Sequence, residues 1–171
     1  MKRFAINTIL ILVCFLLQST VFKAFNVNGI IPNVLVILTA SCGFMQGERT
    51  GMFVGFVCGL LIDLFSFDVI GLSALLFMFL GYLNGKFHNT FYLEDIKLPL
   101  ILLTGSDLFY SLFTYVCHFL LRSRFDFGFY FLNIILPELA YTVLISILIY
   151  PIILLTEFLY RKYENAKESA N

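Results

Sequence analysis

Long apolar runs, separated by short polar breaks, account for most of the sequence. The breaks contain Asn, Gly and charged residues, which are typical of turns between helices. A helix needs roughly 20 apolar residues to cross the hydrocarbon core of a bilayer. The pattern therefore predicts an all-α integral membrane protein, built as a bundle of transmembrane helices. The expected helices cover residues 4–22, 30–45, 51–65, 72–85, 98–121 and 137–159.

The last apolar stretch decides the helix count. Residues 127–159 are too many for one upright span, because a helix rises about 1.5 Å per residue. Pro137 divides the stretch, so the final span is expected to start there, and residues 129–136 either extend it or lie in the membrane interface. This gives six helices, with five as the alternative. Residues 1–159 are expected to form a single transmembrane domain, and residues 160–171 a short, solvated cytoplasmic tail.

The composition supports a membrane protein and excludes several other classes. The chain is 60% hydrophobic and only 13% charged, whereas soluble domains are about one-quarter charged. Its 11 basic and 11 acidic residues balance, so we expect no nucleic-acid partner. The four cysteines lie inside apolar runs without a C-x-x-C spacing, and we therefore expect neither a disulfide nor a metal site.

The distribution of basic residues favours both termini in the cytoplasm. Cytoplasmic segments of membrane proteins carry an excess of Lys and Arg. With the N-terminus inside, eight basic residues fall on the cytoplasmic side and three on the outer side. The inner residues are Lys2, Arg3, Arg49, Lys86, Lys97, Arg161, Lys162 and Lys167, and the outer ones are Lys23, Arg122 and Arg124.

A glycine repeat marks the third expected helix. Gly51, Gly55 and Gly59 recur at every fourth position, and Asp63 continues the series. Residues four apart lie near one face of a helix, so this face forms a groove without side chains. In lipid such a groove lets a second helix, of this chain or of a partner, approach closely. Asp63 is expected to accept hydrogen bonds from backbone N–H groups of the turn at residues 66–71.

Two further acids, Asp107 and Glu138, also lie inside apolar runs. An acid at membrane depth is costly unless it is paired or hydrated. These residues therefore either join helices by hydrogen bonds, which is the favoured interpretation, or serve a proton or a ligand. The segment Gly71-Leu-Ser73-Ala matches part of a rhomboid-protease motif, with His118 as a conceivable base, but it lacks the final glycine. We assign no catalytic, cofactor or metal site.

Four pieces of the sequence resemble, in order, the family of the rod shape-determining membrane protein MreD. The family shows a Pro followed by a polar residue at the second helix, a glycine-rich helix ending in an acid, a further glycine-containing helix and a final helix with Pro and Tyr. In this sequence the pieces are Pro32-Asn33; Gly51, Gly55 and Gly59 with Leu60-Leu-Ile-Asp63; Gly71-Leu-Ser-Ala and Gly81-Tyr-Leu-Asn-Gly85; and Pro137 with Tyr141. The resemblance marks these glycines, Asp63 and Pro137 as candidates for helix packing or interaction.

The resemblance implies a non-catalytic subunit of the bacterial cell-elongation machinery, the elongasome, in the cell membrane. Such a subunit maintains rod shape by scaffolding MreC and lateral-wall peptidoglycan synthesis. Through the complex, family members associate with the MreB filament, the RodA glycosyltransferase and a penicillin-binding transpeptidase. They are also similar in helix arrangement to the substrate-binding subunits of energy-coupling-factor vitamin transporters. The alternative is therefore a transporter subunit that binds a small molecule, although fold similarity alone does not settle function.

Overall fold

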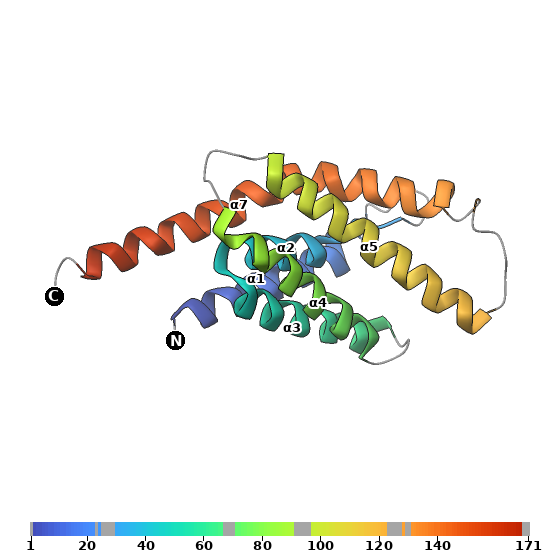
Figure 1. The fold of residues 1–171 in the computed structure, drawn as a ribbon, viewed down its shortest axis with the longest axis horizontal. Coiled ribbons are helices and arrows are strands. Elements are labelled where there is room, and N and C mark those ends of the chain that lie inside the picture. The colour runs from blue at the N-terminus through green and yellow to red at the C-terminus, as the bar shows by residue number, and fades with distance from the viewer. Residues whose placement is uncertain are drawn as a thin grey trace.

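The computed structural model describes residues 2–22, 24, 30–66, 71–90, 97–122, 128 and 131–168. Within these residues the chain forms six α-helices, at the positions that the apolar pattern predicts (Figure 1). They are α1 (Lys2–Leu16), α2 (Val34–Gln46), α3 (Glu48–Ser66), α4 (Leu72–Lys86), α5 (Lys97–Arg122) and α7 (Leu136–Glu168). A π-helical turn at Leu17–Phe22 follows α1, and another at Phe131–Ile135 precedes α7.

Three helical segments of the described chain are long and apolar enough to cross a membrane: Arg3–Phe22, Lys97–Cys117 and Phe131–Tyr163. The helices α2 and α4 are apolar but shorter. These lengths and compositions agree with a membrane protein. Some helices are thus long enough to span a bilayer and others are shorter, as the lengths of the apolar runs predict.

Two predicted helix ends are wrong. The third helix is expected from Gly51 after a polar turn, but α3 already begins at Glu48, and Gly47 alone separates it from α2. Gly47 has a φ of 92°, a left-handed conformation that only glycine adopts without strain, so the chain can reverse direction within one residue. The last helix is expected to end at Leu159, but α7 continues to Glu168 and so includes most of the expected tail.

The helix α2 is the centre of the fold. Every residue from Val34 to Met45 is buried, and α2 contacts each of the other five described α-helices. Its sequence carries no charged residue in this stretch and is apolar or small on all sides, as is typical of a helix buried all round. In Figure 1, α3 and α4 lie on one side of α2, and α5 and α7 lie on the other.

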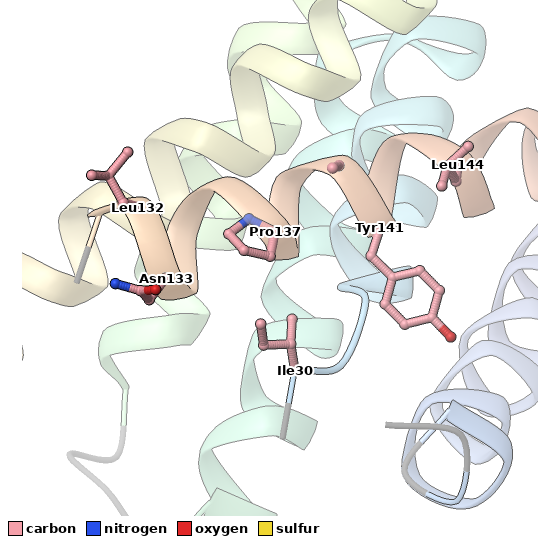
Figure 2. Close-up of a pocket in the computed structure, with 7 residues that line it drawn as sticks. Ile30, Leu132, Asn133, Pro137, Tyr141 and Leu144 are labelled. Carbon is pink, nitrogen blue, oxygen red and sulfur yellow. The ribbon is translucent and has the colours of Figure 1, made fainter. Parts of the chain in front are cut away.

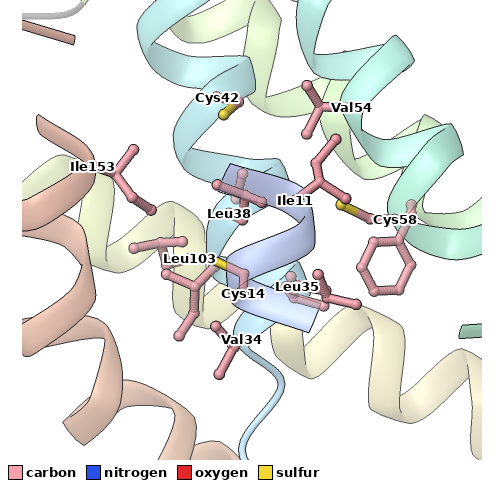
Figure 3. Packing of buried hydrophobic residues seen from close by; sticks show 14 of the residues in the cluster. Ile11, Cys14, Val34, Leu35, Leu38, Cys42, Val54, Cys58, Leu103 and Ile153 are labelled. Carbon is pink, nitrogen blue, oxygen red and sulfur yellow. The ribbon is translucent and has the colours of Figure 1, made fainter. Parts of the chain in front are cut away.

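Side chains from five helices form the hydrophobic core around α2 (Figure 3). Ile11 and Cys14 of α1 pack there with Val54 and Cys58 of α3, and Leu103 of α5 and Ile153 of α7 close the opposite side. The four cysteines are free thiols, and Cys14, Cys42 and Cys58 are buried in this region.

The three long helices leave most of their apolar surface exposed. Only 17% of the most apolar stretch of Arg3–Phe22 is buried, and 22% in each of the other two long segments. Large side chains such as Ile101 of α5 and Leu148 of α7 are more than 60% exposed. Surfaces of this size and composition require lipid or a partner protein to cover them.

The two termini lie at the same end of the molecule, with the C-terminal part of α7 extending beyond the bundle there (Figure 1). Of the three basic residues expected on the outer side, Lys23 and Arg124 lie outside the described residues, as does the side chain of Arg122.

Candidate functional site

The helices α3 and α4 pack backbone against backbone along a glycine seam. The seam consists of Gly51, Gly55 and Gly59 of α3 and Gly81 and Gly85 of α4. A Cβ atom at any of these five positions would lie within 3.0 Å of backbone atoms of the facing helix, a separation that real Cβ atoms do not show. The seam therefore requires glycine at all five positions, because any side chain would force the two helices apart.

The facing surface of α4 fits this groove closely. The carbonyl group of Phe77 lies against Gly55, and the backbone of Ser73 and Ala74 lies against Gly59. The groove predicted from the glycine repeat is thus filled by the next helix of the same chain. A further role of these glycines in binding a partner protein stays a prediction.

Asp63 ends the seam as a hydrogen-bond acceptor for the start of α4. Its Oδ2 atom accepts from the backbone N–H groups of Gly71 at 2.8 Å and Ala74 at 3.1 Å, and its Oδ1 atom accepts from Ser73 at 3.2 Å. The first N–H groups of a helix lack partners within the helix, and the positive end of the helix dipole favours a negative charge there. The carboxylate is 2% exposed, so these bonds compensate for its burial.

Gly71 sets the geometry of this cap. It precedes α4 with a φ of 100°, in the left-handed region. A Cβ atom there would meet nothing within 4 Å, so backbone conformation and not space is what favours glycine. Asp68, which shares this turn in the sequence, lies outside the described residues.

A second buried carboxyl lies between α5 and α7, in a setting that differs from that of Asp63. Asp107 is 0% exposed, and neither of its carboxyl oxygens has a hydrogen-bond partner. Thr142 lies beside it, and Glu138 is near enough for the two acids to interact electrostatically. The hydroxyl of Ser111, beside Glu138, is also buried without a partner. We call Asp107, Ser111, Glu138 and Thr142 the α5–α7 polar group.

The α5–α7 polar group connects to the beginning of α2. The backbone N–H of Asn33 donates to the hydroxyl of Thr142 at 3.2 Å, and the side-chain oxygen of Asn33 accepts from Val36 at 3.4 Å. Asn33 thus caps α2 and ties it to α7. Pro32 precedes this cap, so α2 begins at Val34, slightly later than predicted. The Pro32-Asn33 pair therefore has a local structural role.

Pro137 lies on the wall of a pocket on the surface of α7. The pocket has a volume of about 450 Å³. In Figure 2, Pro137, Tyr141 and Leu144 follow one another along α7, and Ile30 lies nearby on the segment that leads into α2. The complete lining consists of Ile30, Leu132, Asn133, Pro137, Ala140, Tyr141 and Leu144. The pocket is mainly apolar and lies on a helix that is otherwise largely exposed.

A polar network that was not predicted from the sequence lies at the end of the molecule where the termini are found. The carboxylate of Glu157, 6% exposed, accepts from Arg3 of α1, from Arg161 at 3.1 Å and from Gln46 of α2 at 3.1 Å. Gln46 also exchanges two hydrogen bonds with Asn7, and Arg161 donates to the carbonyl oxygen of Met45. This arginine–glutamate network joins the start of α1 to the end of α2 and to the C-terminal part of α7. Its only indication in the sequence was Glu157, an acid within the last apolar run, with the basic residue Arg161 four positions later.

Asn84, in the segment Gly81-Tyr-Leu-Asn-Gly85 of α4, joins α4 to α5. Its side-chain amide donates to the hydroxyl of Ser106 at 2.8 Å and to the carbonyl of Leu80 at 2.8 Å. The backbone N–H of Ser73 is used by Asp63, and the side chain of His118 lies outside the described structure. A serine–histidine pair is therefore not established.

These features define an α-helical membrane protein with a tightly packed helix pair, a central buried helix and polar groups held between helices. Residues 1–162 of the 171-residue chain match the model of the family described as rod shape-determining protein MreD. The chain belongs to this family, and is therefore a membrane protein of rod-shape determination. Comparison with curated proteins and with solved structures gives no match. The expected similarity to vitamin-transporter subunits remains a prediction.

Proposed function

We propose that the protein is a non-catalytic membrane subunit of the cell-elongation machinery, which binds MreC and supports lateral-wall peptidoglycan synthesis. The observation that carries this proposal is the family match over nearly the whole chain. Links to the MreB filament, the RodA glycosyltransferase and the penicillin-binding transpeptidase run through the complex. Nearly all residues of the described part of the chain are helical, which suits a protein that holds partners within and beside the membrane.

The distribution of covered and uncovered surfaces supports this role. The glycine seam closes α3 against α4, and α2 is enclosed by its neighbours. Exposed apolar side chains lie on α5 and α7, as they also do on α1, α3 and α4, but α7 in addition carries the pocket that contains Pro137 and Tyr141. We assign the docking of the partner helix to the α7 face, because there an apolar surface is combined with a recess that can receive a side chain.

The topology belongs to the same proposal. All six helices cross or enter the membrane, and both termini are cytoplasmic. The eight-to-three distribution of basic residues and the common end of the two termini support this orientation. The short helix α2 is sheltered by its neighbours, which makes a shorter span acceptable in the bilayer.

Depletion and complementation test the function. Cells depleted of the protein are expected to become round, and expression of the intact chain is expected to restore rod shape and to co-purify MreC. Cells that stay rod-shaped during verified depletion would contradict the role in shape determination. Normal restoration of shape by a chain that no longer co-purifies MreC would contradict the scaffold role specifically.

A further inference from the structure

We propose that a pocket between the starts of α1 and α3 binds the phosphate of an anionic phospholipid headgroup. Its volume is about 260 Å³, and its lining consists of Arg3, Phe4, Asn7, Arg49, Thr50 and Phe53. We call it the arginine pocket. It combines two guanidinium groups, two neutral polar side chains and two phenyl rings. It lies apart from the glycine seam and from the α7 pocket.

The charge of the pocket favours an anion. Arg3 and Arg161 both donate to the single carboxylate of Glu157, so this network retains an excess of positive charge. The side chain of Arg3 is 39% exposed and lines the pocket, so part of it remains accessible to a ligand there. Arg49 adds a second positive charge and forms no ion pair within the described part of the chain. Guanidinium groups match the oxygen geometry of phosphate well.

The start of α3 adds to this preference. The first helical hydrogen bond there runs from the N–H of Gly51 to the carbonyl of Gly47. The preceding N–H groups, at Glu48, Arg49 and Thr50, are at the positive end of the helix dipole. Thr50 lines the pocket itself, and its hydroxyl is a further donor for a phosphate oxygen.

The phenyl rings favour a lipid over a soluble phosphate. Phe4 and Phe53 are in contact, with ring centroids 5.3 Å apart, and they are 59% and 47% exposed. They extend the pocket by an apolar surface that suits an acyl chain. Arg3 begins the first membrane-crossing segment, so the pocket lies at the level where headgroups are found. Basic pockets between membrane helices on the cytoplasmic side are a recognised geometry for anionic headgroups.

Binding measurements on the purified full-length protein test this site. Native mass spectrometry would be used to compare the retention of phosphatidylglycerol and phosphatidylcholine with matched acyl chains, and of inorganic phosphate. We expect phosphatidylglycerol to be retained preferentially. Arg49→Gln should weaken its binding about fivefold, in line with the contribution of one basic residue near a charged headgroup. Lys162→Gln is the matched control, because Lys162 is an exposed basic residue next to Arg161 but outside the pocket.

The outcomes separate the two phosphate sources. Phe53→Ala should weaken the binding of phosphatidylglycerol, while thermal unfolding of Arg49→Gln and Phe53→Ala should match that of the unmodified protein. Equal retention of both lipids, or equal losses in Arg49→Gln and Lys162→Gln, would overturn the proposal. Inorganic phosphate that displaces phosphatidylglycerol at equal concentration would assign the site to a soluble anion and overturn the lipid assignment.

Discussion

One buried acid lies on each side of α2, and the two acids differ in their hydrogen bonding. On the α3–α4 side, Asp63 accepts three backbone hydrogen bonds and ends a seam without free space. On the α5–α7 side, Asp107 is more deeply buried, yet both of its carboxyl oxygens are unpaired. The hydrogen bonds of Asp63 therefore stabilise the start of α4. The second acid, Asp107, has the hydroxyl of Thr142 and the carboxyl group of Glu138 as its polar neighbours, and a buried acid of this kind is a candidate for function.

The energetic contrast follows from this difference. A buried polar group left unpaired costs about 1–3 kcal/mol, so removing Asp63 would strand the N–H groups that it now satisfies. Removing Asp107 would leave its neighbour Thr142 with the hydrogen bond that its hydroxyl accepts from the N–H of Asn33. On this basis the α3–α4 side is the structural half of the molecule, and the proposed docking of a partner belongs to the α5–α7 side. Four substitutions, from the largest expected effect to the smallest, test this division.

The largest effect is expected from a side chain placed in the glycine seam. Gly59→Leu would force α3 away from the backbone of Ser73 and Ala74 and should cost about 3 kcal/mol or more. The membrane abundance of a folded, monodisperse protein, measured by fluorescence-detected size-exclusion chromatography, should fall sharply. Gly105→Leu is the control, because a Cβ atom at Gly105 meets nothing within 4 Å. Normal abundance of Gly59→Leu would contradict the seam.

Loss of the α4 cap is expected to come next. Asp63→Leu removes the acceptor for three N–H groups and should destabilise the protein by roughly 3 kcal/mol. Asp63→Asn keeps one acceptor oxygen, so its loss should be clearly smaller. Thermal unfolding of both variants in detergent measures the difference. If Asn destabilises the protein as much as Leu, the negative charge itself is required and the cap alone does not explain Asp63.

Asp107→Leu should change stability by less than about 1 kcal/mol, because the hydroxyl of Thr142 beside it keeps its hydrogen bond from the N–H of Asn33. We expect nearly normal abundance and unfolding temperature, together with less co-purified MreC and incomplete restoration of rod shape. The division between the two sides fails if Asp107→Leu unfolds as readily as Asp63→Leu.

The turn before α4 is expected to have the smallest effect on rod shape, although its effect on stability exceeds that of Asp107→Leu. Gly71→Ala places a Cβ atom on a residue with a φ of 100°, which costs about 1–2 kcal/mol. Gly71→Asn should cost less, since Asn tolerates the left-handed conformation better. The same unfolding assay ranks the two variants, and an alanine variant as stable as the unmodified protein would show that the turn adopts another conformation.

The sequence was sufficient to predict the helix positions, the close packing of the glycine helix and the acceptor role of Asp63. These features depend on residues near one another in the chain: Gly55 and Phe77, or Asp63 and Gly71, belong to adjacent helices. Short connections leave few ways to pack adjacent helices, so the local pattern is informative.

The central position of α2 and the arginine–glutamate network were not predictable in the same way. An apolar helix buried by protein and one surrounded by lipid have the same composition, so Val34 to Met45 did not reveal their enclosure. The network joins Arg3 to Glu157, 154 positions apart. No periodicity within one helix indicates such a pairing, which depends on how the first and last helices meet.

Site-specific photo-crosslinking in living cells tests the division between the two sides most directly. Leu75 of α4 and Leu144 of α7 are both 63% exposed, and Leu144 lines the α7 pocket. A photoreactive residue introduced at position 144 should form a crosslink to MreC, whereas the same residue at position 75 should not. A crosslink to MreC from position 75 with none from position 144 would place the partner on the α3–α4 side and contradict the account.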